Sequence, residues 1–347
     1  VAKEISKKAS LEFVKIKRVK EIEKIIKHDV MAVVNALAEV CEGKAGEFVH
    51  FGATSNDITD TALALQLRDA MKLIIGDLNK LEGALLDLAE RHKTTVMVGR
   101  THGQHAIPTT LGLKFAIFAR EIARHIQRLK ECKKRLLVGK MSGAVGTQAG
   151  FGKKGIEIQK YVMDELGLTP AEVSSQIVQR DRLAEFIVKL ALLGSTLDKM
   201  GREIRNLQRT EIAEVEEPFE IVTQVGSSTM PHKRNPIKSE KVCGLARILR
   251  ANAHAAMENI VLEHERDLSN SSCERIIVPE SCLLIDEMLK EMQNIMSGLK
   301  INMNKIERNL YLTQGLNMTE AIMIELTKRE MGRQTAHEII RRCAMEA

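Results

Sequence analysis

The feature that most constrains the fold is a long apolar stripe with helical spacing. Between Asp181 and Glu211, apolar residues recur every three or four positions without a break. The stripe consists of Leu183, Phe186, Leu190, Leu193, Leu197, Met200, Ile204 and Leu207. At about 1.5 Å per residue, such a helix is roughly 45 Å long, and its stripe needs partners of similar length. The pattern therefore predicts a bundle of long helices.

Similar stripes recur over residues 74–88 and 111–136, and further long helices are expected near 238–263 and 275–299. The composition agrees, because aromatic residues make up only 3% of the chain and Pro occurs six times. Few aromatics favour helices over sheets, and few prolines permit long helices. We therefore expect an all-α fold of long, roughly antiparallel helices. Apolar positions on more than one helix face would pack one subunit against another.

The chain has 347 residues, 44% of them hydrophobic and 28% charged, which is typical of a folded protein. No apolar run approaches the roughly 20 residues that span a bilayer. Six cysteines without a Cys-x-x-Cys pair predict reduced thiols and a cytoplasmic location; they are Cys41, Cys132, Cys243, Cys273, Cys282 and Cys343. The net charge of +6 is spread among few aromatics, which does not favour nucleic-acid binding. A small polyanionic substrate would suit this charge, although charge alone does not decide it.

Three stretches rich in Gly, Ser, Thr and Pro interrupt the helical pattern, and each leads into a helix. They are residues 51–57, 99–110 and 224–236. The third stretch places two serines beside Gly226 and two cations and an amide in a segment bounded by prolines. Backbone N–H groups, cations and an amide together suit an anionic ligand. The plain alternative is a turn with surface charges.

The third stretch resembles the signature of the fumarase/aspartase superfamily. Its sequence GSSTMPHKRNP fits the pattern small-small-x-Met-Pro-x-Lys-x-Asn-Pro. The second stretch, GRTHGQHAIPTT, resembles the version in adenylosuccinate lyases, whereas the superfamily's cycloisomerases lack a His at the position of His102. Further matches are KHD at 27–29, TSNDITDTA at 54–62, SGAVGT at 142–147 and HERDLSNSSCER at 264–275. The resemblance covers nearly the whole chain in the family's order.

This resemblance implies a metal-free homotetramer with a shared central helix core and no cofactor. Its reaction would release fumarate from adenylosuccinate, giving AMP, and from SAICAR, giving AICAR, in purine nucleotide biosynthesis. In such tetramers three subunits each supply one loop to a shared active site, so a monomer should be inactive. The alternatives are another lyase or a cycloisomerase of the superfamily, and a non-enzymatic protein that reuses the fold. Retention of His102, Ser227 and Lys233 argues against the last.

Elimination needs a base to remove a proton from carbon and an acid to protonate the departing nitrogen. The resemblance assigns the acid to His102, and an imidazole can hold or release a proton near neutral pH. It assigns the base to Ser227. An isolated hydroxyl is a poor base, so N–H groups, a helix N-terminus or Lys233 must activate it. Ser228 is expected to be its hydrogen-bonding neighbour.

The resemblance also supplies the substrate-binding residues. Lys233 and Asn235 would hold the succinyl carboxylates, with Thr54 and Ser55 binding a carboxylate as well. The remaining predicted positions, near base, carboxylate or phosphate, are Lys27, His28, Asp29, Gln208, Ser228, Arg234, Arg266, Ser271 and Arg275. The planar fork of Arg suits phosphate.

Several candidates have plain structural alternatives. His28 could be a histidine at a helix end, Thr54 an N-cap for a helix starting near Asp57, and Gln208 a polar residue packed between subunits. His102 and His105 form a His-x-x-His pair, but no acidic or Cys partners cluster around it, so we predict no metal site. The roles of His50, His232 and His264 stay open between auxiliary ligand and surface group.

We expect three blocks along the chain. Residues 1–70 would be part of an N-terminal helical domain, 71–300 the central long-helix bundle, and 301–347 the start of a C-terminal helical domain. The chain starts at Val1 rather than at Met. The family has an Arg-Tyr pair in a segment before this point and more of a helical domain after residue 347, so we expect both to be missing from this sequence.

Overall fold

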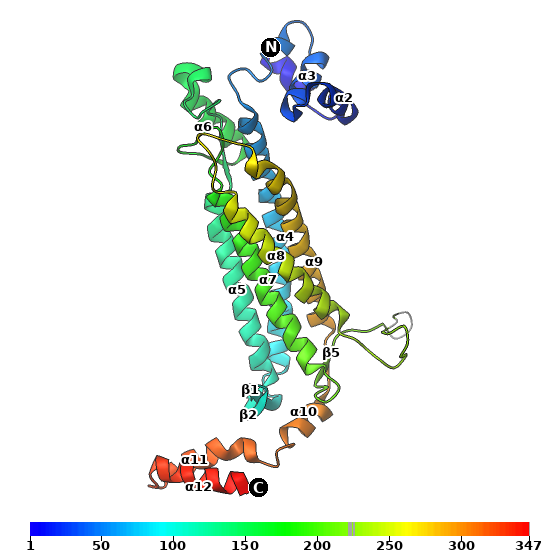
Figure 1. Ribbon diagram of the computed structural model, residues 1–347, viewed down its shortest axis with the longest axis vertical. Helices are drawn as coiled ribbons and strands as arrows, with labels where there is room; N and C mark the ends of the chain where they lie inside the picture. The colour runs from blue at the N-terminus through cyan, green and yellow to red at the C-terminus, as the bar shows by residue number, and fades with distance from the viewer. Residues whose placement is uncertain (221–223, 225, 347) are drawn as a thin grey trace. The chain divides into compact units, whose positions relative to one another are not determined.

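The computed structural model describes residues 1–220, 224 and 226–346, and its helices confirm the predicted all-α class (Figure 1). The long helices are α4 (Ser55–Arg91), α5 (Leu111–Leu136), α7 (Asp181–Leu207), α8 (Ile237–Glu258) and α9 (Ser269–Gly298). The shorter α-helices are α1 (Ala2–Lys8), α2 (Ile16–Ile26), α3 (Asp29–Val40), α6 (Gly155–Leu166), α10 (Met303–Leu310), α11 (Thr319–Lys328) and α12 (Arg333–Glu346). The 3-10 segments are η1 (Ala45–Phe48), η2 (Ala149–Lys154), which is kinked at Gly152, and η3 (Leu316–Met318).

The bounds of the long helices follow the apolar stripes closely. Helix α5 has the predicted bounds, and α7 ends at Leu207, the last apolar residue of its stripe, rather than near Glu211. Helix α8 ends at Glu258 instead of near residue 263. Helix α9 starts at Ser269, earlier than the predicted 275, because its first turn is polar and gives no stripe. Periodicity therefore located the helices better than it located their polar ends.

The chain divides into two compact units, each built from segments far apart in sequence. The first unit comprises Val1–Lys72, Lys130–Phe186 and His254–Val278. The second unit comprises Leu73–Leu129, Ile187–Ala253 and Pro279–Ala347. The long helices contribute residues to both units.

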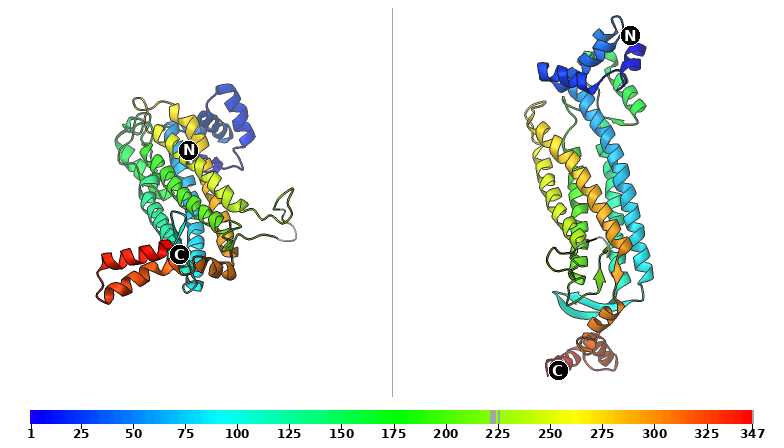
Figure 2. Two further views of the ribbon diagram at one scale, coloured as in Figure 1. Left: turned by 60° about the horizontal axis from the view of Figure 1, so that its bottom comes forward. Right: turned by 90° about the vertical axis from the view of Figure 1, so that its right-hand side faces the viewer.

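In the second unit, the segments of α4, α5, α7, α8 and α9 lie side by side (Figures 1 and 2). Their stripes form the core, whose fully buried members include Leu78, Leu81, Leu85, Ile122, Leu190, Leu197, Leu249, Met288 and Leu289. Each such side chain contributes about 2 kcal/mol through burial of apolar surface. Gly194 allows α8 to approach α7 closely, since a Cβ there would lie 2.8 Å from Leu249 Cδ1. The prediction that the apolar stripes pack against one another in a helix bundle is thus confirmed.

A β-hairpin in the second unit was not predicted from the sequence. Strands β1 (Val96–Thr101) and β2 (Gln104–Thr110) pair antiparallel, with Thr101 opposite Gln104. His102 and Gly103 alone form the turn, with φ of 53° and 76°. Two consecutive left-handed residues are typical of a type I′ hairpin turn. The second predicted loop is therefore an ordered hairpin whose turn contains His102.

Two-residue strands complete the secondary structure. Strand β3 (Val138–Gly139) pairs parallel with β4 (Thr169–Pro170) in the first unit. Strand β5 (Val215–Glu216) pairs antiparallel with β6 (Lys300–Ile301) in the second unit. In the part of the chain that the structure describes, no helix is both long and apolar enough to cross a membrane.

A buried carboxylate organises the first unit where α4 begins. The Lys140 ammonium donates to Asp57 Oδ1 at 2.5 Å, and neither side chain has any exposed surface. Asp57 also accepts hydrogen bonds from the backbone N–H groups of Thr54, Ser142 and Gly143. A buried charge is tolerated only when it is fully paired in this way. Asp57 thereby fixes the glycine-rich loop after β3 to the start of α4.

Candidate active site

The signature loop, defined as residues 226–236, closes on itself in the second unit. Asn235 Nδ2 donates a hydrogen bond of 3.0 Å to the Gly226 carbonyl oxygen. A Cβ on Gly226 would overlap the carbonyl oxygen of Lys233, so only glycine fits there without a shift. These contacts join the two ends of the loop just before α8. Val225, which belongs to the predicted stretch, lies outside the described residues.

The Ser227 hydroxyl points back toward its own loop. Its Oγ accepts hydrogen bonds from the backbone N–H groups of Met230 at 3.1 Å and Thr229 at 3.3 Å. Two donors aimed at one oxygen stabilise negative charge on it. Ser228 Oγ lies 3.5 Å from Thr229 Oγ1. The expected role of Ser228 as the hydrogen-bonding neighbour of Ser227 stays a prediction.

The two cations of the loop, Lys233 and Arg234, differ in whether an ion pair already holds them. The Arg234 guanidinium donates to Glu216 Oε1 at 2.8 Å and lies 5.5 Å from the centroid of the Phe219 ring. Gln208 Nε2 donates to the Arg234 carbonyl oxygen at 3.3 Å, so two predicted site residues meet here. Lys233 is exposed, and no ion pair holds its ammonium among residues 1–220, 224 and 226–346. The Lys233 ammonium is therefore available to an anion.

A hollow of about 570 Å³ borders the signature loop in the second unit. Gln208, His232 and Arg234 line it together with Lys300 and Asn302. Small-molecule sites are typically hollows of about 300–1,000 Å³ with a few polar groups. Glu216, the partner of Arg234, also lines the hollow, so its size and lining suit a polar ligand. His232, whose role was open, is one of its lining residues.

His102 lies exposed at the tip of the β1–β2 hairpin. Below it, Arg100 makes two hydrogen bonds to the Glu214 carboxylate, at 2.6 and 3.0 Å. His105 pairs with Arg100 across the strands, and its Nδ1 is buried without a partner. Burial and the Arg100 cation lower the pKa of His105, against a smaller upward effect of Glu214. Of the two histidines in the hairpin, His102 is the exposed one.

No three His, Cys, Asp or Glu side chains gather where they could hold a metal ion in the described ranges. The expectation of a metal-free reaction stays a prediction.

In the first unit, the turn from Lys27 to Asp29 meets the first part of α9. The Met31 N–H donates to His28 Nδ1 at 3.3 Å, so His28 caps α3 as its structural alternative predicted. Asp29 Oδ2 accepts from Arg275 at 2.7 Å. Burial would raise the pKa of Asp29, but the Arg275 hydrogen bond and a backbone N–H lower it below its usual value. The structure thus joins Asp29 and Arg275.

A second link in the first unit joins Thr54 to Arg266 through a residue that sequence analysis missed. Gln176 Nε2 donates to Thr54 Oγ1 at 3.4 Å, and Gln176 Oε1 accepts from Arg266 at 3.1 Å. Thr54 directly precedes α4, which begins at Ser55, and the Thr54 N–H donates to Asp57 Oδ2. No pattern in the sequence marked Gln176.

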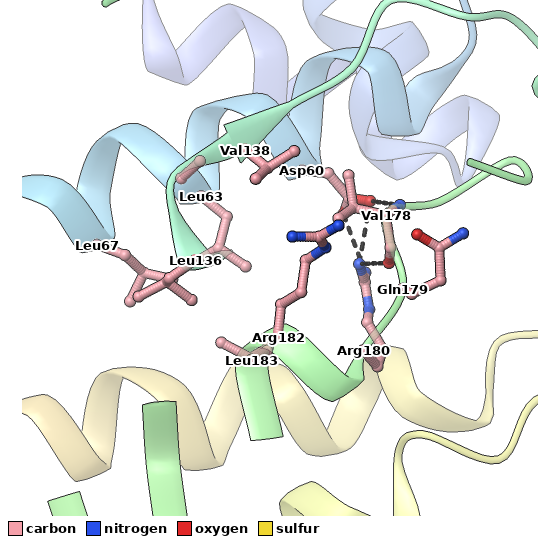
Figure 3. Close-up of a pocket in the computed structure, with 11 residues that line it drawn as sticks. Asp60, Leu63, Leu67, Leu136, Val138, Val178, Gln179, Arg180, Arg182 and Leu183 are labelled. Atoms are coloured by element: carbon pink, nitrogen blue, oxygen red, sulfur yellow. Dashed lines mark hydrogen bonds and ion pairs between the residues drawn. The ribbon is translucent and has the colours of Figure 1, made fainter. Parts of the chain in front are cut away.

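Buried charges also hold the starts of α4 and α9 in the first unit. Arg180 donates twice to Asp60, at 2.9 and 3.0 Å (Figure 3). The Arg180 Nε also pairs with Glu274 Oε1 at 2.9 Å. Burial alone would lower the pKa of Arg180, but the two carboxylates raise it. The adjoining cavity of about 30 Å³ holds no more than about one water, so it is not a substrate site. Arg180 is a structural centre, and its partner Glu274 lies in α9 beside Arg275 and three residues after Ser271.

His50 and His264 share an unusual backbone conformation, with φ of 69° and 50°. Burial lowers the pKa of His50, Asp57 raises it, and His28 lowers it. The net result is a lowered pKa for His50, which belongs to the first unit. The candidate residues thus fall into two groups, with His102 and Ser227 in the second unit. The first unit holds Lys27, His28, Asp29, Thr54, Ser55, Arg266, Ser271 and Arg275, and the second holds His102, Gln208, Ser227, Ser228, Lys233, Arg234 and Asn235.

The long-helix bundle and the signature loop define the class of the protein, a lyase of the fumarase/aspartase superfamily. Residues 2–249 match a family model described as "Lyase". Residues 315–347 match one described as "Adenylosuccinate lyase C-terminus". A solved fumarate lyase from Mesorhizobium sp. superposes with a TM-score of 0.90 at 32% identity, covering 100% of this chain and 77% of that one.

Named relatives narrow the class. The adenylosuccinate lyase of Methanocaldococcus jannaschii is 58% identical, with 100% of this chain and 75% of the relative covered. The enzyme of the same name from Bacillus subtilis is 42% identical, with 96% and 76% covered. The chain belongs to the adenylosuccinate lyase family. The resemblance inferred from the signature motifs is thereby confirmed.

Proposed function

We propose that this chain eliminates fumarate from adenylosuccinate, giving AMP, and from SAICAR, giving AICAR. The names of its relatives and the retained residues of the signature loop support this activity. The structural observation that supports it best is the Ser227 oxygen, which accepts two backbone N–H groups. Those donors meet the requirement that a serine base be activated.

The proposed reaction moves one proton at each end of the breaking bond. After its own hydroxyl proton has passed to solvent, the Ser227 alkoxide removes the proton from the succinyl carbon. The electrons left behind enter the adjacent carboxylate before forming the C=C bond of fumarate. The C–N bond then breaks, its electron pair goes to nitrogen, and His102 supplies the proton there. The Lys233 ammonium would stabilise the extra negative charge of the carbanion.

The other candidates would bind the substrate. Lys233, Asn235, Thr54 and Ser55 would hold the carboxylates. Lys27, His28, Asp29, Gln208, Ser228, Arg234, Arg266, Ser271 and Arg275 would contact the nucleotide or a carboxylate. Asn235 and Arg234 already donate to Gly226 and Glu216, so they would bind with their remaining N–H groups or exchange partners.

We also infer a homotetramer in which three subunits supply one site. Large apolar side chains on the long helices of the second unit are exposed; they are Leu73, Leu86, Leu113, Ile117, Leu192, Ile248 and Leu283. Such side chains on several helices are the surface that helix-to-helix association between subunits would bury. The three-block domain division and a cytoplasmic location belong to the same proposal, the latter supported by six reduced cysteines.

A second candidate function is a cycloisomerase reaction. A solved 3-carboxy-cis,cis-muconate lactonizing enzyme from Pseudomonas putida superposes with a TM-score of 0.87 at 38% identity. It covers 97% of this chain, and this chain covers 74% of it. The presence of His102 favours the lyase, because a departing nitrogen needs an acid.

The direct test is fumarate release by the purified chain. We expect fumarate from both adenylosuccinate and SAICAR, and none from a Ser227→Ala variant. Cyclisation of 3-carboxymuconate without release of fumarate would instead establish the second candidate.

Shared sites have their own test. Inactive His102→Ala and Ser227→Ala proteins, mixed and allowed to exchange subunits, should regain activity, because some hybrid sites then contain both intact residues. If subunits exchange, as shown by mass-tagged copies, and no activity returns, both residues come from one chain.

A further inference from the structure

The strand ladder alone does not fix the direction of the hairpin tip. The register of β1 and β2 shifts between Val98 and Arg100. At this shift the Ile107 carbonyl oxygen lies over Gly99, where a Cβ would come within 2.7 Å of it. Such bulges increase the local twist and redirect the side chains beyond them. The tip that presents His102 therefore needs a contact outside the hairpin to set its direction.

The ion pair between Arg100 and Glu214 supplies such a contact, beside the packing of β1 against α10 and of β2 against η3. Two hydrogen bonds of 2.6 and 3.0 Å join the guanidinium to both carboxylate oxygens. The Glu214 side chain is 0% exposed and that of Arg100 is 18% exposed. A bidentate pair of this kind fixes orientation as well as distance. Arg100 precedes His102 by only two residues.

Glu214 is itself held rigidly by the second unit. Its N–H donates to the Leu207 carbonyl oxygen at the end of α7, and its carbonyl oxygen accepts from Asn302, each at 2.9 Å. Asn309 Nδ2 of α10 donates to Glu214 Oε1 at 2.8 Å. Glu214 is thus fixed at its backbone and its side chain before it meets Arg100.

We propose that Arg100 and Glu214 are a positioning pair that aims the His102 imidazole at the departing nitrogen. The proposal rests on the acid role given to His102 under the proposed function. The Arg100 guanidinium and the Glu214 carboxylate are already hydrogen-bonded to each other. They would therefore affect the reaction indirectly, by fixing the two-residue turn that carries His102. A misdirected acid reduces the stabilisation of the transition state more than it reduces the affinity for the substrate. Loss of the pair should therefore lower kcat and leave KM almost unchanged.

The test compares Glu214→Gln with the matched variant Glu203→Gln. Gln keeps the shape of Glu214 and its acceptor for Asn309, but removes the charge. Glu203 pairs with Lys114 at 2.6 Å between α7 and α5 of the same unit, with both side chains 28% exposed. We expect Glu214→Gln to lower kcat about 10- to 100-fold with KM changed less than about threefold. Glu203→Gln should stay near wild type, and Arg100→Lys should fall between them because Lys lacks the fork.

A second readout needs no substrate. The ring signal of His102 in a histidine-labelled NMR spectrum is identified by its absence in His102→Gln. We expect that signal to shift in Glu214→Gln and Arg100→Lys but not in Glu203→Gln. An unmoved His102 signal with unchanged kcat would overturn the pair's role. Equal losses of kcat and of melting temperature in both Gln variants would also overturn it. If the wild-type chain releases no fumarate, the proposed function fails, and the NMR comparison still decides whether the pair orients His102.

Discussion

The hairpin and the signature loop present their reacting side chains in two different ways, although both belong to the second unit. The hairpin combines a strand ladder with the buried Arg100–Glu214 pair. The signature loop is closed by a contact within itself. It is joined to the rest of the unit by a partly exposed ion pair of Arg234 with Glu216 at 2.8 Å and by a hydrogen bond from Gln208. Exposed ion pairs contribute only about 0–1 kcal/mol. We infer that the protein core sets the place of the acid in advance, whereas local contacts and the bound substrate set the place of the base.

The largest expected effect comes from removing the proposed acid or the proposed base itself. His102→Ala and Ser227→Ala should each lower kcat at least about 1,000-fold while the oligomer stays intact, because acid and base are both required. Steady-state kinetics and size-exclusion chromatography measure these two quantities. A Ser227→Ala protein with a near-normal rate would show that Ser227 is not the base.

A smaller effect should separate loop closure from overall stability. Gly226→Ala places a methyl group against the Lys233 carbonyl oxygen and opens the loop. We expect kcat to fall about 100-fold with little change in melting temperature, since the loop adds little to the core. The control is Gly244→Ala in α8, where nothing lies within 4 Å and the helix should gain about 1 kcal/mol. A large fall in melting temperature for Gly226→Ala would mean that the loop is part of the core.

The stability of the fold depends on pH, so the hairpin and the signature loop can be compared only in the pH range where the chain stays folded. His125 is buried in the second unit, with Nε2 2.8 Å from Thr196 Oγ1. Burial and the Arg128 cation lower its pKa to about 4.

Between the usual pKa of about 6.5 and this lowered value, the unfolded chain binds a proton that the folded chain does not. The free energy of unfolding should therefore fall by about 2–3 kcal/mol as the pH drops from 7 to 4. Urea unfolding at several pH values measures this loss, and His125→Gln should remove most of it. An equally steep loss in His125→Gln would assign the effect to other groups.

The smallest effect concerns the hairpin turn itself. Gly103 has φ of 76° with open space around it, so Gly103→Ala adds only backbone strain of about 1 kcal/mol. We expect a loss of kcat of roughly fivefold, which corresponds to that strain. Steady-state kinetics of Gly103→Ala and Gly226→Ala, measured in parallel, test this expectation. A loss as large as that of Gly226→Ala would show that the hairpin is no better held than the loop.

The sequence predicted the helices because a buried stripe has to repeat with the helix period. It predicted the site residues through motif resemblance, which assigns roles without giving contacts. The hairpin at 96–110 was missed because Gly99 and Pro108 interrupt its short apolar run. The Arg100–Glu214 and Thr54–Gln176 contacts were missed because their partners are 114 and 122 residues apart. Such pairs follow from tertiary packing, which no local pattern encodes.

The tight turn at His102 has a consequence for how this chain can change. Because Thr101 faces Gln104 directly, one added or deleted residue would move the imidazole to the opposite side of the ribbon rather than slide it along. The histidine position is therefore adjustable only in discrete jumps. Substrate preference in descendants of this chain should drift through the surrounding residues, while the length between the strands stays constant.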